Sequence, residues 1–157
     1  MSFTYLQLKD AIKAYTEYEE TSFVNNIPLF IRLSEERILK NVQLSLFRKN
    51  ATAQTSASVQ YIKVPSDFLA PFSMSMTGTD GDKFFLDFKD PSFVQEYTPD
   101  PTTTGSPRYY CVFDVDNFLL APTPNAAFTA ELHYFYRPQS ITELSDSSTT
   151  WLSENAE

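Results

Sequence analysis

The chain has 157 residues, which suits one compact domain with a core of its own and some appendages. Its formal net charge of -8 opposes phosphate and anionic lipid, which argues against sequence-independent nucleic-acid binding. The single cysteine excludes an internal disulfide, and no apolar run or leader pattern predicts a membrane span or secretion, so we expect a soluble protein made in a reducing compartment.

A helix is predicted in "TYLQLKDAIKAYTEYEE" near the start of the chain. Leu8, Ile12 and Tyr15 recur at helical spacing, which predicts one apolar face that packs inward. Either Thr4 or Ser2 is available as its N-terminal cap. A second helix follows after a short loop, and the two are expected to form a helical hairpin.

The second helix is predicted to begin at a cap on Asn26, with Pro28 in the first turn. Charged residues four apart indicate ion pairs on its outer side, and apolar residues recur along the other side. The pairs are Arg32 with Glu36 and Glu36 with Lys40, and the apolar face contains Ile27, Ile31, Ile38 and Val42.

From about Leu44 the pattern becomes that of β-strands. Residues 59–64 alternate, a turn is expected at Pro65 and Asp67, and "LAPFSMSM" follows as a strand. Asp80-Gly81 lies between two apolar runs, which predicts a hairpin whose two turn residues both adopt positive φ.

The next segments predict one short helix and a small meander. "DPSFVQEY" is expected to be helical, and residues 98–107, "TPDPTTTGSP", form a loop with too many prolines to pair in a sheet. Residues 108–115, 118–122 and 128–138 then predict three antiparallel strands joined by turns.

These elements predict an α+β fold: an N-terminal helical hairpin packed with a small antiparallel β-sandwich or barrel-like domain. The expected domains are residues 1–43, the hairpin, and residues 44–138, the β-domain. Residues 139–157 are expected to be a polar linker and the start of a further helix that belongs to the helical part, opened by a hydroxyl cap before Trp151 and Leu152.

No motif in the sequence predicts catalysis, a cofactor or a metal. His133 has no second histidine or cysteine near it, and Cys111 has no histidine partner, so a packed or surface histidine and a small buried thiol are the favoured interpretations. The aspartate pairs at 80 and 82 and at 114 and 116 lack the rest of a calcium loop and are better explained by turns. We therefore expect a protein that is not an enzyme.

Aromatic residues make up 15% of the chain and cluster in the predicted strands. Because successive side chains on a strand face opposite ways, not all of them can pack in one core, which predicts contacts with other subunits. The residues concerned are Phe84, Phe85, Phe88, Tyr109, Tyr110, Tyr134, Phe135 and Tyr136.

The order of five segments resembles the head-to-tail adaptor (connector) proteins of tailed bacteriophages, a group broadly similar to tail tubular protein A of short-tailed phages. The resemblance spans nearly the whole chain. The segments are "YLQLKDAIKAYTE", "FIRLSEERILKNV", "VPSDF", "GSPRYYCVFDVDNFLLAPTPNAAFTAELHYFY" and "TTWLSENAE". In that family the pattern usually continues into further helices after the last segment.

The resemblance implies a structural virion protein at the head-to-tail interface. Its expected partners are the portal protein, identical subunits that form a dodecameric ring, and the next tail component. Genomic DNA is expected to pass through the channel without specific binding. The candidate interface residues are Phe30, Arg32, Arg37, Lys40, Pro99, Pro107 and Trp151. The alternative is a carbohydrate-binding or baseplate and fibre accessory module that stacks sugars on Tyr109, Tyr134 or Trp151.

Overall fold

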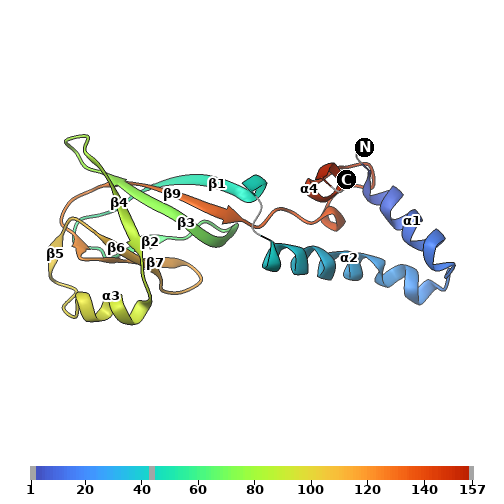
Figure 1. The fold of residues 1–157 in the computed structure, drawn as a ribbon, viewed down its shortest axis with the longest axis horizontal. Helices are drawn as coiled ribbons and strands as arrows, with labels where there is room; N and C mark the ends of the chain where they lie inside the picture. Colours follow the sequence, from blue (N-terminus) through green and yellow to red (C-terminus); the bar gives the residue numbers. More distant parts are fainter. Residues whose placement is uncertain (1–2, 43–44, 156–157) are drawn as a thin grey trace. The chain divides into compact units, whose positions relative to one another are not determined.

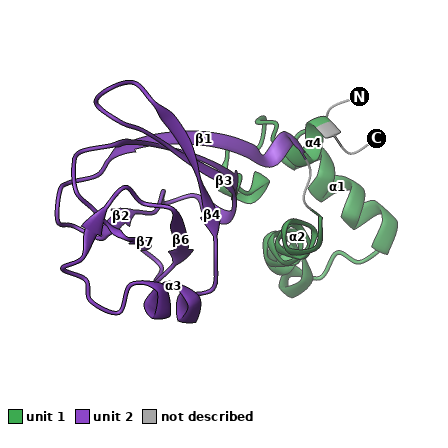
Figure 2. Ribbon diagram, turned by 60° about the vertical axis from the view of Figure 1, so that its left-hand side comes forward, with its two compact units in different colours: residues 1–44, 137–157 green, residues 45–136 purple. Residues whose placement is uncertain are grey.

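A computed structural model of the protein describes residues 3–42 and 45–155 (Figure 1). The chain divides into two compact units, residues 1–44 with 137–157, and residues 45–136 (Figure 2). The alternative cap Ser2, the predicted boundary between residues 43 and 44, and residues 156–157 of the predicted C-terminal helix lie outside the described residues. Helices together with a mixed sheet confirm the predicted α+β class.

The first helix, α1, spans Tyr5–Thr16 and begins at a capping box on Thr4. The backbone N–H of Gln7 donates to Thr4 Oγ1 at 3.3 Å, and the backbone N–H of Thr4 donates to Gln7 Oε1 at 2.9 Å. These bonds satisfy two N–H groups that the helix itself leaves unpaired. The predicted helix and its Thr4 cap are confirmed.

The inward face of α1 is shorter than its sequence predicts. Leu8 and Ile12 pack against the core of the first unit, but the side chain of Tyr15 is 92% exposed. The predicted inward position of Tyr15 is therefore wrong, because the apolar stripe continues beyond the surface that the rest of the unit covers.

The second helix, α2, spans Thr21–Asn41 and begins before the predicted cap. Asn26 lies inside the helix, where its side-chain amide donates to the carbonyl of Ser22 at 2.8 Å. Pro28 is likewise in the helix interior. The predicted start is wrong because Phe23, upstream of these residues, packs against the core of the unit and extends the buried face.

The buried face of α2 contains a carboxylate. Ile27, Ile31, Glu35 and Leu39 are buried at a spacing of four residues, whereas Ile38 is half-buried and Val42 is exposed. The predicted face thus needs correction at its C-terminal end. Glu35 lies on the buried face because its carboxyl group accepts hydrogen bonds there. Apolar spacing in the sequence cannot predict a buried carboxyl group.

The donors for Glu35 come from the far end of the chain. The Ser140 hydroxyl donates to Glu35 Oε2 at 2.5 Å, and the backbone N–H of Ile141 donates to Glu35 Oε1 at 3.1 Å. Ile141 opens a short 3-10 helix, η2 (Ile141–Glu143), and its buried side chain packs with Tyr5 and Ile27. Residues 139–150 are therefore more than the polar linker that the sequence predicts.

A short helix, α4 (Trp151–Asn155), follows and confirms the predicted start of a C-terminal helix. The predicted hydroxyl cap before Trp151 is wrong, because Thr150 Oγ1 is buried without a hydrogen-bond partner in the described residues and Thr149 Oγ1 donates to Glu154 Oε1 at 3.2 Å. Instead, Ser153 Oγ inside the helix accepts from the backbone N–H of Thr150 at 2.8 Å. Leu152 packs against the same core as Ile141, and α4 lies near the start of α1 in both views (Figures 1 and 2).

The second unit is a nearly closed seven-stranded sheet with one helix. The strand order is β1-β9-β3-β4-β6-β7-β2, and a short 3-10 turn, η1 (Ser45–Phe47), precedes the sheet. The strands are β1 (Arg48–Gln54), β2 (Tyr61–Lys63), β3 (Phe68–Thr77), β4 (Lys83–Phe88), β6 (Tyr109–Val112), β7 (Asn117–Ala121) and β9 (Thr129–Tyr136).

The topology differs from the predicted meander in two pairings. Strands β6 and β7 are antiparallel as predicted, but β9 lies between β1 and β3 instead of beside β7. Strands β4 and β6 pair in parallel, with Asp87 opposite Tyr109. A parallel pair needs a long crossover connection, and here α3 (Pro91–Tyr97) and the loop after it provide one.

The hairpin between β3 and β4 is confirmed, although its turn is longer than predicted. Thr77 pairs with Lys83, and the backbone N–H of Gly78 donates to the carbonyl of Asp82 at 3.0 Å. Among the residues of this turn, only Gly81 has a positive φ, of 88°. The turn is therefore not the two-residue type in which Asp80 would share that conformation.

The Pro/Thr loop also forms a short strand. Within residues 98–107, β5 (Thr104–Gly105) pairs in parallel with β8 (Thr123–Pro124), which corrects the predicted unpaired loop. The Thr123 hydroxyl donates to the carbonyl of Pro101 at 2.8 Å. Pairing is possible because the prolines of this loop lie outside the two paired residues.

The core of the second unit is apolar and rich in rings, and a polar network closes one end of it. Tyr134 donates to Asp67 Oδ1 at 2.7 Å, and Lys49 Nζ lies 2.7 Å from Asp67 Oδ2. Burial alone raises the pKa of Asp67, but the bonds from Lys49 and Tyr134 outweigh it and lower that pKa below its usual range. The core contains Ile62, Met74, Met76, Leu86, Tyr110, Phe118, Leu120, Phe128, Ala130, Leu132 and Tyr134.

Replacing the buried carboxyl group in Glu35→Ala should lower the free energy of unfolding by about 1–3 kcal/mol, because two donors lose their acceptor. The matched control is Glu36→Ala, whose half-exposed side chain pairs with Arg137 at 3.1 Å and should cost at most about 1 kcal/mol. Chemical denaturation measures both values, and equal losses would contradict a special role for Glu35.

Asp67→Asn should destabilise the protein by about 1–3 kcal/mol at neutral pH. Because the native pKa of Asp67 is lowered, its contribution is present above the unfolded pKa of about 3.9 and is lost as the pH falls through the native pKa. Unfolding curves from neutral to acidic pH should therefore converge for the wild type and the variant, and a constant difference would disprove the linkage.

Candidate interaction surfaces

The outward face of α2 exposes large apolar side chains. Phe30 is 47% exposed and Leu33 is 58% exposed, and Leu29 lies on the same side of the helix. Arg37 and Lys40 continue this face toward the C-terminal end and are also exposed. The helix is therefore apolar on two sides, one buried in its own unit and one exposed.

Arg32, in contrast, takes part in an internal contact. Its guanidinium donates to Glu143 Oε1 at 2.7 Å, which holds η2 against α2. The predicted pair with Glu36 is replaced by this contact, while Lys40 Nζ lies 4.0 Å from Glu36 Oε2 as predicted. Phe30, Arg37 and Lys40 thus form one surface, and Arg32 points to the returning chain.

The remaining predicted interface residues differ in how far they are buried. Pro99 is exposed, Pro107 is almost fully buried, and Trp151 is half-buried at the start of α4. Burial leaves the Pro107 side chain little surface to offer a partner. Pro99 and Trp151 remain predicted contacts.

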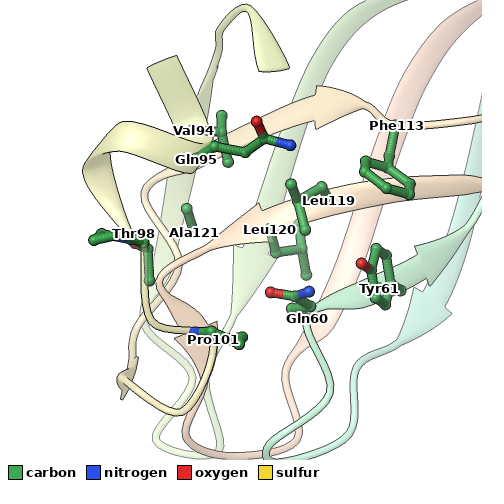
Figure 3. A pocket seen from close by; sticks show the side chains of 11 residues that line it. Gln60, Tyr61, Val94, Gln95, Thr98, Pro101, Phe113, Leu119, Leu120 and Ala121 are labelled. Carbon is green, nitrogen blue, oxygen red and sulfur yellow. The ribbon is translucent and has the colours of Figure 1, made fainter. Parts of the chain in front are cut away.

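A pocket of about 220 Å³ lies in the second unit between α3, β7 and the start of β2 (Figure 3). Tyr61 and Phe113 close one end, with ring centroids 5.4 Å apart, while Thr98 and Pro101 lie at the other end. The floor is apolar and comes from α3 and β7. It consists of Val94, Leu119, Leu120 and Ala121.

Two side-chain amides face this pocket from different elements. Gln95 extends from α3, and Gln60 lies on the opposite side beside β2 (Figure 3). Neither amide makes a hydrogen bond within the described part of the chain. None of the lining side chains carries a charge, so the pocket suits an uncharged group with apolar and hydrogen-bonding parts.

The aromatic residues of the strands divide between core and surface. Tyr110, Tyr134 and Phe135 are buried, whereas Phe85 and Phe88 are exposed. Neighbouring Tyr134 and Phe135 face opposite sides of the sheet, and both are covered within the chain. Burial raises the pKa of Tyr110 to about 12. Tyr134 is buried and donates to Asp67, so its ring offers no face for the sugar stacking that the alternative hypothesis assigns to Tyr109, Tyr134 or Trp151.

Tyr109 belongs to an aromatic cluster on α3. Its ring contacts Phe93 and Tyr97 edge-on at centroid distances of 5.1 and 4.7 Å, and Lys89 Nζ lies 5.9 Å from its centroid. Tyr109 is half-buried by these neighbours. This packing, rather than an open platform for stacking, accounts for its position.

The titratable residues singled out from the sequence lie in the core, in a turn and on the surface of the sheet. Cys111 is buried, and burial raises the pKa of its thiol. Asp114 Oδ1 accepts from the backbone N–H groups of Asp116 and Asn117 at 2.7 and 2.8 Å, which confirms a turn role. His133 Nε2 lies 3.7 Å from Glu131 Oε1 on the sheet surface.

The described residues contain neither a metal-ligand cluster nor a membrane-spanning helix. In residues 3–42 and 45–155, no three metal-ligating side chains gather into a group. Among the helices that the structure describes, none has both the length and the apolar character required to span a membrane.

An exposed apolar helix face and an uncharged pocket are features of proteins that bind other proteins. The exposed face of α2 is thus a surface of the kind that binds other proteins. The model of the SU10 adaptor protein family matches residues 3–157, and the chain belongs to that family. Membership gives it a structural adaptor role in a bacteriophage and a place in the virion. The comparison with curated proteins gives no match.

Sequence reasoning missed Leu29 and Leu33 on the outer face of α2, and it missed Gln60 and Gln95 at the pocket. The first pair had a signal, because apolar residues recur on two sides of the same helix. No sequence signal marks the two glutamines, because the pocket that they face forms only when α3 packs beside β7.

Leu33→Ser should change the free energy of unfolding by no more than about 0.5 kcal/mol, because the side chain is exposed. Ile31→Ser, on the buried side of the same helix, should cost about 2–5 kcal/mol. Thermal unfolding of both variants checks this difference. A large loss in Leu33→Ser would mean that the outer face is covered within the chain.

Proposed function

We propose that the protein is a head-to-tail adaptor that docks on the portal. Identical copies form a ring below the portal, extend the DNA channel and join it to the next tail component. The observation that carries this proposal is the family match over residues 3–157. The role is one of assembly by surface complementarity and involves no catalysis.

The outward face of α2 supports docking on another protein. Leu29, Phe30 and Leu33 expose apolar surface, and Arg37 and Lys40 add positive charge at one end. Burying such a patch against a complementary surface removes apolar area from water and gives the contact its main stabilisation. In this proposal the helical part, residues 1–43 with 139–157, and the β-domain, residues 44–138, are separate docking modules.

The net charge supports passage of DNA without binding. A chain of net charge -8, repeated around a ring, repels the phosphate backbone and does not hold the duplex in the channel. The protein is made in the host cytoplasm and is incorporated at the head-to-tail interface of the virion. Neither a membrane nor a cofactor takes part.

Co-sedimentation with the portal ring from the same genome tests the proposal. The wild-type chain, titrated to saturation, should bind near one chain per portal subunit. A version extended beyond Glu157 is tested beside it if the gene continues. The absence of saturable binding by either version would refute the portal as partner.

Leu33→Glu should weaken portal binding by about tenfold or more, because it places a carboxylate in the apolar contact. The matched control is Ser56→Glu, which adds the same charge at an exposed position in the second unit. Equal binding by the two variants would exclude the outer face of α2 from the portal contact.

A further inference from the structure

The pocket between α3, β7 and β2 limits the size and charge of what can enter it. Its volume of about 220 Å³ lies below the roughly 300–1,000 Å³ of sites for drug-sized ligands. No lining side chain is charged, so a charged group would lose its hydration there without an ionic partner. The pocket therefore suits one uncharged side chain of another protein.

The two glutamines further limit the chemistry of that side chain. Gln60 and Gln95 direct amides at the pocket and have no hydrogen-bond partner within the described chain. An occupant without a polar atom would cover them and leave them unpaired, which is unfavourable. A side chain with an apolar ring and a polar tip, as in tyrosine, meets both the floor and the amides.

This chain itself presents such a side chain. Four tyrosines of the described chain are exposed, namely Tyr15, Tyr18, Tyr61 and Tyr97. Tyr18 donates to Glu20 Oε2 at 2.6 Å, Tyr61 lines the pocket, and Tyr97 packs on Phe93 and Tyr109. Tyr15 is 92% exposed and takes part in no hydrogen bond or ring contact within the described residues.

We propose that Tyr15 of one copy inserts into this pocket of a second copy, with its hydroxyl bonded to the amides of Gln60 and Gln95. The inserted Tyr15 side chain and the pocket are different surfaces of the same chain. The contact is therefore heterologous, so each copy can both insert its Tyr15 and receive that of another copy. A contact of this kind closes a ring when the rotation between copies is a whole fraction of a turn, and the inference rests on the ring of the proposed function.

The other strongly exposed apolar residues fit the pocket less well. Val115 is 90% exposed and Phe85 is 70% exposed, but neither side chain has a polar atom for the amides. Tyr15 also stands on a regular helix, so docking it requires little additional ordering of the backbone. The proposed contact therefore joins the exposed side chain of Tyr15 to a pocket that is already formed in the structure.

Photocross-linking tests the contact directly. Tyr15→p-benzoylphenylalanine keeps an aromatic side chain at the position, and the variant is assembled on the portal ring from equal amounts of isotope-labelled and unlabelled chains. Illumination should link residue 15 to peptides containing residues 60–61, 94–101 or 113–121, in pairs that combine labelled with unlabelled copies. Tyr18→p-benzoylphenylalanine is the control and should not reach these peptides.

A second measurement uses ordinary substitutions. Tyr15→Ala should weaken self-association by about tenfold or more, Tyr15→Phe should weaken it less, and Tyr18→Ala should leave it unchanged.

Photocross-links from residue 15 that map to other peptides, or that form only within one copy, would overturn the inference. Portal binding by the wild type would still support the proposed function in that case. If the wild type fails to bind the portal, that function fails, and the same cross-linking in concentrated solution decides the Tyr15 contact alone.

Discussion

The first unit depends on holding together two segments that are far apart in the sequence. The chain leaves this unit after α2, builds the second unit, and returns at residue 137. Glu35 fixes the return, because its buried carboxyl group accepts from Ser140 and from the backbone of Ile141. Burying a carboxyl group is costly without such donors, so this position favours the folded arrangement only when the return segment is present.

This constraint explains why α2 can serve two purposes. One side of the helix is covered by α1 and by the returning chain around Ile141, so the opposite side, with Phe30 and Leu33, stays available. An adaptor protein needs stable subunits whose surfaces are unsatisfied until assembly. In the proposed adaptor role, a helix that is apolar on two sides meets this requirement, because one side stabilises the subunit and the other stays available for a partner.

Local patterns predicted the elements well wherever neighbouring residues decide the conformation. The Thr4 cap of α1, the helix after Asp90 and the Asp114 turn all follow from side chains that bond the nearby backbone. The failures have a different cause. The start of α2, the inward position of Tyr15 and the partner of β9 depend on which surfaces meet in three dimensions.

The sequence by itself determined the α+β class, most helices and strands, and the adaptor family, because caps, turns, periodicity and segment order are local or linear properties of the chain. Only the tertiary structure decided that Glu35 is buried, that β4 and β6 run parallel, and that Gln60 and Gln95 share a pocket. These features join residues that are distant in sequence, and their free energy depends on packing and burial, which arise only when the chain has folded.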